Sequence, residues 1–73
     1  MSLEIATRGD GVGIKHAETG SLFIFSDVPV NNPQICIQRN GMVYVSYERD
    51  GTAYKRDVIT AGEKIFYGDE VKI

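Results

Sequence analysis

Apolar residues fall on both faces of a three-stranded meander that the sequence predicts between Gln34 and Ile59. Asn40-Gly41 and Asp50-Gly51 each lie between β-rich runs. Such pairs are the strongest short-range signal for a two-residue hairpin loop with positive φ at both positions. A sheet with one solvated face alternates between apolar and polar residues, and this meander does not. Both of its faces therefore need cover.

The two predicted loops define a register for the meander. The first would place Tyr44 opposite Ile37, and the second would place Tyr54 opposite Tyr47. Because neighbouring residues of a strand point to opposite sides, this register assigns each apolar residue to a face. One face would carry Ile35, Ile37, Met42, Tyr44 and Ile59, and the other would carry Cys36, Val43, Val45, Tyr47, Tyr54 and Val58.

Shorter strand patterns flank the meander, and the segment from Asp27 to Pro33, with its two prolines, is predicted to be an irregular connector. Six to eight short, mostly antiparallel strands predict an all-β fold: a single small barrel or sandwich around the central three-stranded meander. We expect residues 1–73 to form one domain and give little weight to residues 1–3. The flanking strands are predicted at residues 3–7, 12–16, 21–26, 64–67 and 70–73.

Composition and charge indicate the cellular environment in which the protein is expected. The single cysteine, Cys36, excludes an intrachain disulfide, and its apolar neighbours predict a buried, unreactive thiol. No apolar run approaches the roughly 20 residues of a membrane helix, and no signal peptide is evident. The formal charge of −2 provides no overall attraction to nucleic acid or anionic lipid. We therefore expect a cytoplasmic protein that does not engage membranes.

The sequence nominates no catalytic or metal-binding group. Acid–base or nucleophilic catalysis needs a base close to an acid or nucleophile, and this chain has one histidine, one cysteine and no paired motif. A metal site needs several convergent ligands, so His16 is interpreted as a strand-end or surface residue. We predict a protein that is not an enzyme and holds no cofactor or metal.

A mild excess of positive charge marks the only candidate binding residues. Between Arg39 and Arg56 the chain holds four basic residues against Glu48 and Asp50. Basic residues can contact phosphates, and tyrosines can stack on bases, so this segment could serve a nucleic-acid-binding regulator. The candidate binding residues are Arg39, Tyr44, Tyr47, Arg49, Tyr54, Lys55 and Arg56.

The segment from Ala61 to Ile73 resembles the opening hairpin of the carbon storage regulator family of small RNA-binding proteins. It has a glycine–glutamate turn, an alternating strand, a glycine–aspartate turn and a second alternating strand. The resemblance implies RNA binding, covers about a fifth of the chain and lies at the opposite end from its place in the family. The family's valine-histidine-arginine segment, with its RNA-contacting arginine, has no counterpart, so no RNA-binding residue is transferred. The matching positions are Gly62, Glu63, Ile65, Gly68, Asp69, Val71 and Ile73.

Two-sided hydrophobic strands without catalytic groups favour a non-catalytic interaction module. We expect a homo-oligomer that binds another macromolecule, because a second copy would supply the cover that a chain of this length cannot. The interface is expected to contain Tyr44, Tyr47 or Tyr54. A protein partner is favoured over nucleic acid, and the nucleic-acid-binding regulator is the alternative.

Overall fold

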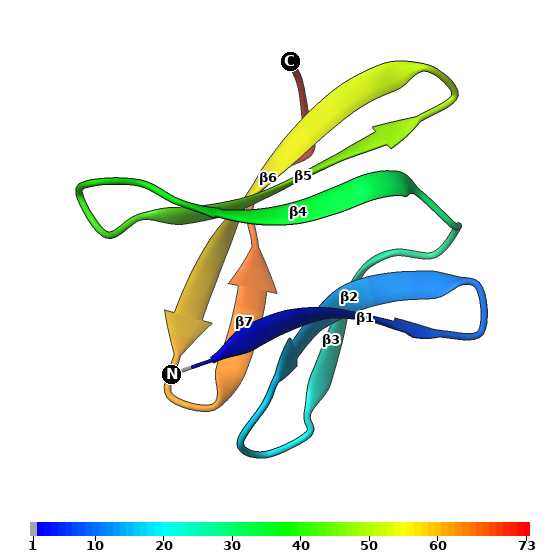
Figure 1. Cartoon of the computed structure of the whole chain (residues 1–73). Helices are drawn as coiled ribbons and strands as arrows, with labels where there is room; N and C mark the ends of the chain where they lie inside the picture. The colour runs from blue at the N-terminus through cyan, green and yellow to red at the C-terminus, as the bar shows by residue number, and fades with distance from the viewer. Residues whose placement is uncertain (1) are drawn as a thin grey trace.

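A computed structural model describes residues 2–73 and shows an all-β fold of two antiparallel sheets (Figure 1). The predicted fold class and the central meander, β4-β5-β6, are confirmed. In the larger sheet the order is β4-β5-β6-β7, with β8 also paired to β6. The smaller sheet contains β1 (Leu3–Arg8), β2 (Gly11–His16) and β3 (Leu22–Ser26), and the larger one contains β4 (Asn31–Ile37), β5 (Val43–Arg49), β6 (Thr52–Ala61), β7 (Lys64–Tyr67) and β8 (Val71–Lys72).

The two sheets form a sandwich and do not close into a barrel. Strand β1 lies beside β4, and β3 lies beside β7, but no ladder of backbone hydrogen bonds joins the sheets at either place. The molecule is 17 Å thick in its thinnest direction, which suits two packed sheets about 10 Å apart. Of the two predicted architectures, the structure has the sandwich.

The core lies between the sheets. At its centre the Phe25 ring stacks on Tyr47, with centroids 5.1 Å apart, and meets Tyr67 edge-on at 5.7 Å. Aromatic pairs at these separations add to the stabilisation that burial alone provides. The buried hydrophobic residues are Val12, Ile14 and Phe25 from the smaller sheet and Val45, Tyr47, Val58 and Ile65 from the larger one.

Tyr67 joins the two sheets where β7 meets β3. Its hydroxyl donates a hydrogen bond to the Phe23 carbonyl oxygen at 2.5 Å and accepts one from the Ile14 N–H at 3.2 Å. Next to this contact, Gly13 passes so close to β3 that a Cβ atom would overlap the Phe23 carbonyl group and lie 2.9 Å from the Ile24 Cα. This junction of β3 and β7, which we call the seam, therefore depends on the Tyr67 hydroxyl. The adjoining approach of β2 to β3 depends on the absence of a side chain at Gly13.

The predicted second turn is confirmed. Asp50 and Gly51 have φ values of 54° and 78°, and the flanking strands pair with Tyr47 opposite Tyr54. Two consecutive positive φ values are the signature of the type I′ turn that the Asp-Gly pair predicts.

The first turn differs from the prediction. The Gly41 N–H donates to the Gln38 carbonyl at 3.0 Å, and the Gln38 N–H donates to the Met42 carbonyl at 2.8 Å. With a φ of 84° at Gly41, this is a three-residue loop that ends in one left-handed residue. The predicted register is therefore wrong by one residue, and Tyr44 lies opposite Cys36.

This shift turns β4 over relative to the prediction. Ile35 and Ile37 lie opposite Val45 and Val43, on the side that faces the smaller sheet, whereas Cys36 points to the other side and is half-buried. The prediction of a buried Cys36 next to Val45 is wrong, because a slip of one residue exchanges the two faces of a strand. Ile37 remains 75% exposed because the β4–β5 hairpin, at the left of Figure 1, extends beyond the smaller sheet.

Two further segments differ from the sequence prediction. Strand β4 begins at Asn31 within the predicted connector, with a bulge and a φ of 50° at Asn32. Strands β7 and β8 do not pair with each other, because both pair with β6, one after the other along its edge. The Gly68-Asp69 pair is thus a break in an edge strand, and the segment that resembles the carbon storage regulator hairpin does not form that hairpin.

Candidate functional site: the outer face of the larger sheet

We call the side of the β4–β8 sheet that faces away from β1–β3 the outer face, and the opposite side the inner face. The inner face of β5 and β6 holds four of the seven candidate binding residues. Val45 is fully buried on this face, and side chains two and four residues further along β5 point the same way. The four residues are Tyr47, Arg49, Tyr54 and Arg56.

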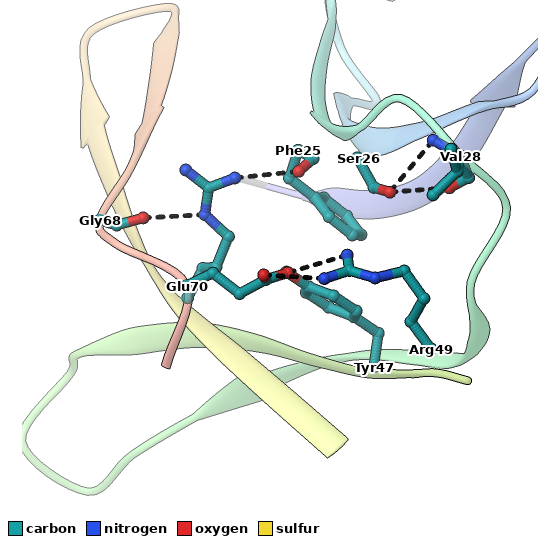
Figure 2. A network of polar contacts seen from close by, with 8 residues as sticks. Phe25, Ser26, Val28, Tyr47, Arg49, Gly68 and Glu70 are labelled. Carbon is teal, nitrogen blue, oxygen red and sulfur yellow. Dashed lines mark hydrogen bonds and ion pairs between the residues drawn. The ribbon is translucent and has the colours of Figure 1, made fainter. Parts of the chain in front are cut away.

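Tyr47 and Arg49 converge on the carboxylate of Glu70, as Figure 2 shows. The Tyr47 hydroxyl donates to one carboxylate oxygen, while the Arg49 guanidinium contacts both oxygens at 3.0 and 2.9 Å. The guanidinium also lies over the Tyr54 ring, 4.7 Å from its centroid. Hydrogen bonds from Arg49 and Tyr47 hold the pKa of the Glu70 carboxyl below its usual value. This cluster fastens the chain just before β8 to the sheet.

Arg56 connects three strands. Its Nε donates to the Gly68 carbonyl at 2.8 Å, and its Nη1 donates to the Phe25 carbonyl at 2.9 Å. Its guanidinium lies 5.5 Å from the Tyr67 ring centroid. These contacts occupy Arg56 within the fold, so we interpret it, like Arg49, as a structural residue.

The other three candidate residues do not join the inner-face set. Arg39 lies in the β4–β5 loop, and Tyr44 and Lys55 lie on the outer face, where the Lys55 ammonium is 5.7 Å from the Tyr44 ring centroid. The structure thus divides the seven residues between a loop and the two faces of one sheet, and it does not bring them together as one binding surface.

The outer face carries most of the exposed hydrophobic side chains. Eight large hydrophobic residues are exposed, and five of them point outward from this sheet, at strand positions that alternate with buried ones such as Val58 and Ile65. Met42, which lies two residues before Tyr44 and just ahead of β5, shares the side of Tyr44. The five are Met42 (54% exposed), Ile59 (52%), Phe66 (52%), Val71 (49%) and Ile73 (70%).

These five side chains form two clusters at opposite ends of the outer face. The first cluster contains Met42, Ile59 and Phe66, with Ile59 directly opposite Phe66. The second contains Val71 and Ile73, which adjoin Lys55 and Ala53 of β6. Lys55 and Asp57 lie between the clusters on the same strand.

A shallow cleft of about 290 Å³ opens on the same face beside the second cluster. Its polar wall includes Asn32, whose side-chain amide donates to the Glu48 carboxylate at 2.8 Å. Asn32 lies on β4 and Glu48 lies on β5. The cleft therefore spans both strands and is one part of the larger outer face. Its lining residues are Asn32, Gln34, Ser46, Tyr47, Glu48, Ala53 and Ile73.

The two residues best suited to nucleophilic or base chemistry lie in different sheets. His16 ends β2, is 3% exposed, and packs edge-on against Phe23; its Nε2 has no hydrogen-bond partner among residues 2–73. Of the two predicted positions, the strand end is confirmed and the surface is not, because the fold covers all but 3% of His16. Cys36 lies on the outer face of β4. Within residues 2–73, no three side chains of the His, Cys, Asp and Glu types form a group that could hold a metal ion.

Comparisons with protein-family models, curated proteins and solved structures find no match for this chain. The resemblance of the last strands to the carbon storage regulator hairpin therefore has no support beyond its turn and strand pattern. Residues 2–73 contain no helix that is long and apolar enough to cross a membrane.

Proposed function

We propose that this protein is a non-catalytic association module that forms a homo-oligomer through its outer face and in that form binds another macromolecule. The observation that carries the proposal is the set of five large hydrophobic side chains that share this face and that no strand of residues 2–73 covers. Each leaves roughly 100 Å² of apolar surface in contact with solvent, and a patch of a few hundred Å² promotes association.

The sheet edges favour contact through the face over contact through an edge. Strand β4 carries Pro33, which lacks an N–H group, and a bulge near Asn32 that interrupts its ladder. On the opposite edge, Gly68 to Glu70 separate β7 from β8. Breaks of this kind oppose the addition of another strand, whereas the outer face offers apolar side chains at both of its ends.

A nucleic-acid-binding function receives less support from the same geometry. Arg49 and Arg56 are engaged in contacts within the chain, and Tyr47 is 2% exposed, so these residues present neither a free charge nor a stacking surface. We further propose a reducing, cytoplasmic setting, which suits the free thiol of Cys36.

Sedimentation velocity from about 1 to 100 μM tests the proposal. The wild-type protein should sediment as a dimer or larger species, and Phe66→Glu, which puts a charge in the first cluster, should give a monomer. Ile37→Glu is the matched control, because Ile37 is 75% exposed but lies at the hairpin end of the inner face. It should behave like the wild type.

A wild-type monomer at 100 μM would refute the proposed self-association. Fluorescence anisotropy with labelled single-stranded RNA at low salt tests the alternative function, nucleic-acid binding. Binding that falls steeply as salt rises would instead favour the nucleic-acid-binding regulator.

A further inference from the structure

Two opposite charges that form no ion pair among residues 2–73 mark the middle of the outer face. Lys55 and Asp57 are exposed and lie two residues apart on β6, so they point to the same side. Among residues 2–73 the ion pairs are Lys15 with Glu4 and Arg49 with Glu70, and neither Lys55 nor Asp57 takes part in one. One apolar cluster flanks this pair of charges on each side.

We propose that the outer face binds a second copy of this chain about a two-fold axis that runs across the strands, between Lys55 and Asp57. This inference rests on the proposed function and specifies its interface. A two-fold interface must be self-complementary. If residue i of one copy contacts residue j of the partner, then residue j of the first copy contacts residue i of the partner. The axis brings Lys55 of each copy to Asp57 of the partner subunit, which makes two equivalent ion pairs.

The same axis also joins the apolar clusters. Because β6 of one copy runs antiparallel to β6 of the other, Ile59 and Phe66 of each copy cover the end of the partner that carries its second cluster, while Met42 faces Glu48 of the partner subunit. Ile59 then faces Ala53 of the partner subunit, and Phe66 faces Ile73 of the partner subunit. Val71 of the partner subunit then faces Gly68, which has no side chain and therefore leaves room for it.

The available area suits a stable dimer. Five half-exposed apolar side chains contribute roughly 500 Å² per copy. A standard interface buries about 800 Å² on each partner, of which about 56–65% is non-polar. The polar remainder is present as Lys55, Asp57 and the rim of the cleft. Two aligned sheets also pack face to face in many proteins.

Charge reversal tests this arrangement. In Lys55→Asp, the new carboxylate would face Asp57 of the partner subunit, and in Asp57→Lys two ammonium groups would meet. Each variant alone should dimerise at least 10-fold more weakly than the wild type, because opposed like charges in an interface are strongly unfavourable. An equimolar mixture of the two should form a heterodimer within about threefold of the wild-type affinity, because both ion pairs then form again, one with the wild-type polarity and one with the polarity reversed.

Sedimentation velocity of the separate and mixed variants gives the result, with Lys72→Asp as the control. Lys72 is exposed on β8 and lies opposite Tyr54, on the inner side. Its reversal should leave dimerisation unchanged. A wild-type monomer would overturn the proposed function together with this inference. If the wild type dimerises, but the mixture of the two variants dimerises no more tightly than either variant alone, the two-fold arrangement alone would be overturned.

Discussion

Replacing Tyr67 by Phe removes the hydroxyl group that joins the two sheets at the β3–β7 seam. The change leaves the aromatic ring, and with it the edge-on contact to Phe25, in place. It deletes one hydrogen bond to the Phe23 carbonyl and one from the Ile14 N–H. A hydrogen bond contributes about 0.5–1.5 kcal/mol, and a buried backbone group left unpaired costs about 1–3 kcal/mol. We expect the free energy of unfolding to fall by about 2 kcal/mol.

Urea unfolding of the variant and the wild type at equal protein concentration measures this loss. The midpoint should fall at an unchanged m-value, and for a chain of this length the midpoint temperature should fall by roughly 10 °C. Tyr54→Phe is the control, because the Tyr54 hydroxyl takes no part in the hydrogen bonds that join the two sheets among residues 2–73. A loss below about 0.5 kcal/mol in Tyr67→Phe would show that this hydroxyl does not hold the seam.

Alkaline pH provides a second measurement on the same group. Burial raises the pKa of Tyr67 to about 12, from about 10 in an unfolded chain. The fold therefore favours the neutral phenol. Its contribution is fully present below pH 10 and is lost as the pH rises through 12. Stability should fall less between pH 10 and 12 in Tyr67→Phe than in the wild type. Equal losses would contradict the assignment to Tyr67.

Two other substitutions test the seam and the Glu70 cluster. Gly13→Ala should lower the free energy of unfolding by more than about 2 kcal/mol in urea titrations, because the new methyl group overlaps the Phe23 carbonyl; an unchanged midpoint would refute the close approach. Glu70→Gln should lower the midpoint temperature at pH 7, and the difference from wild type should shrink as the pH falls below 4.5, because the contacts with Arg49 and Tyr47 lower the Glu70 pKa and protonation removes their advantage. A pH-independent difference would show that the carboxylate charge is not what Arg49 and Tyr47 recognise.

The second hairpin could be predicted from sequence because its local chemistry allows few alternatives. Asp50 and Gly51 both adopt positive φ, and this turn alone sets the register of β5 against β6. The prediction that Met42, Tyr44 and Ile59 share a face depends only on that register. The structure places all three on the outer face.

The first hairpin could not be predicted with the same rule. An Asn-Gly pair fits a two-residue loop, and it also fits a three-residue loop in which only Gly41 is left-handed. In the structure the Asn40 side chain accepts a hydrogen bond from the Met42 N–H at 3.0 Å, which stabilises the longer loop. The difference of one residue moved Ile35 and Ile37 to the inner face.

The candidate site was only partly accessible from sequence. The alternation along β5 could have predicted the position of Arg49. This residue is four positions from the buried Val45, so it points to the same, inner side of the sheet. The second apolar cluster had no local signal. Gly68-Asp69 has the composition of a turn, and only the pairing of both β7 and β8 with β6 brings Val71 and Ile73 to the outer face.

The uncovered face should also make stability depend on protein concentration. The smaller sheet covers the inner face, whereas no strand among residues 2–73 covers the outer face, which the proposed self-association would cover with a second copy. A small domain is marginally stable alone, and a partner that binds only the folded state adds stability as its concentration rises above the dissociation constant. The midpoint temperature of the wild type should therefore rise between 1 and 100 μM, whereas that of Phe66→Glu should stay constant. A constant midpoint for a wild-type protein that sediments as a dimer would show that association is not coupled to folding through this face.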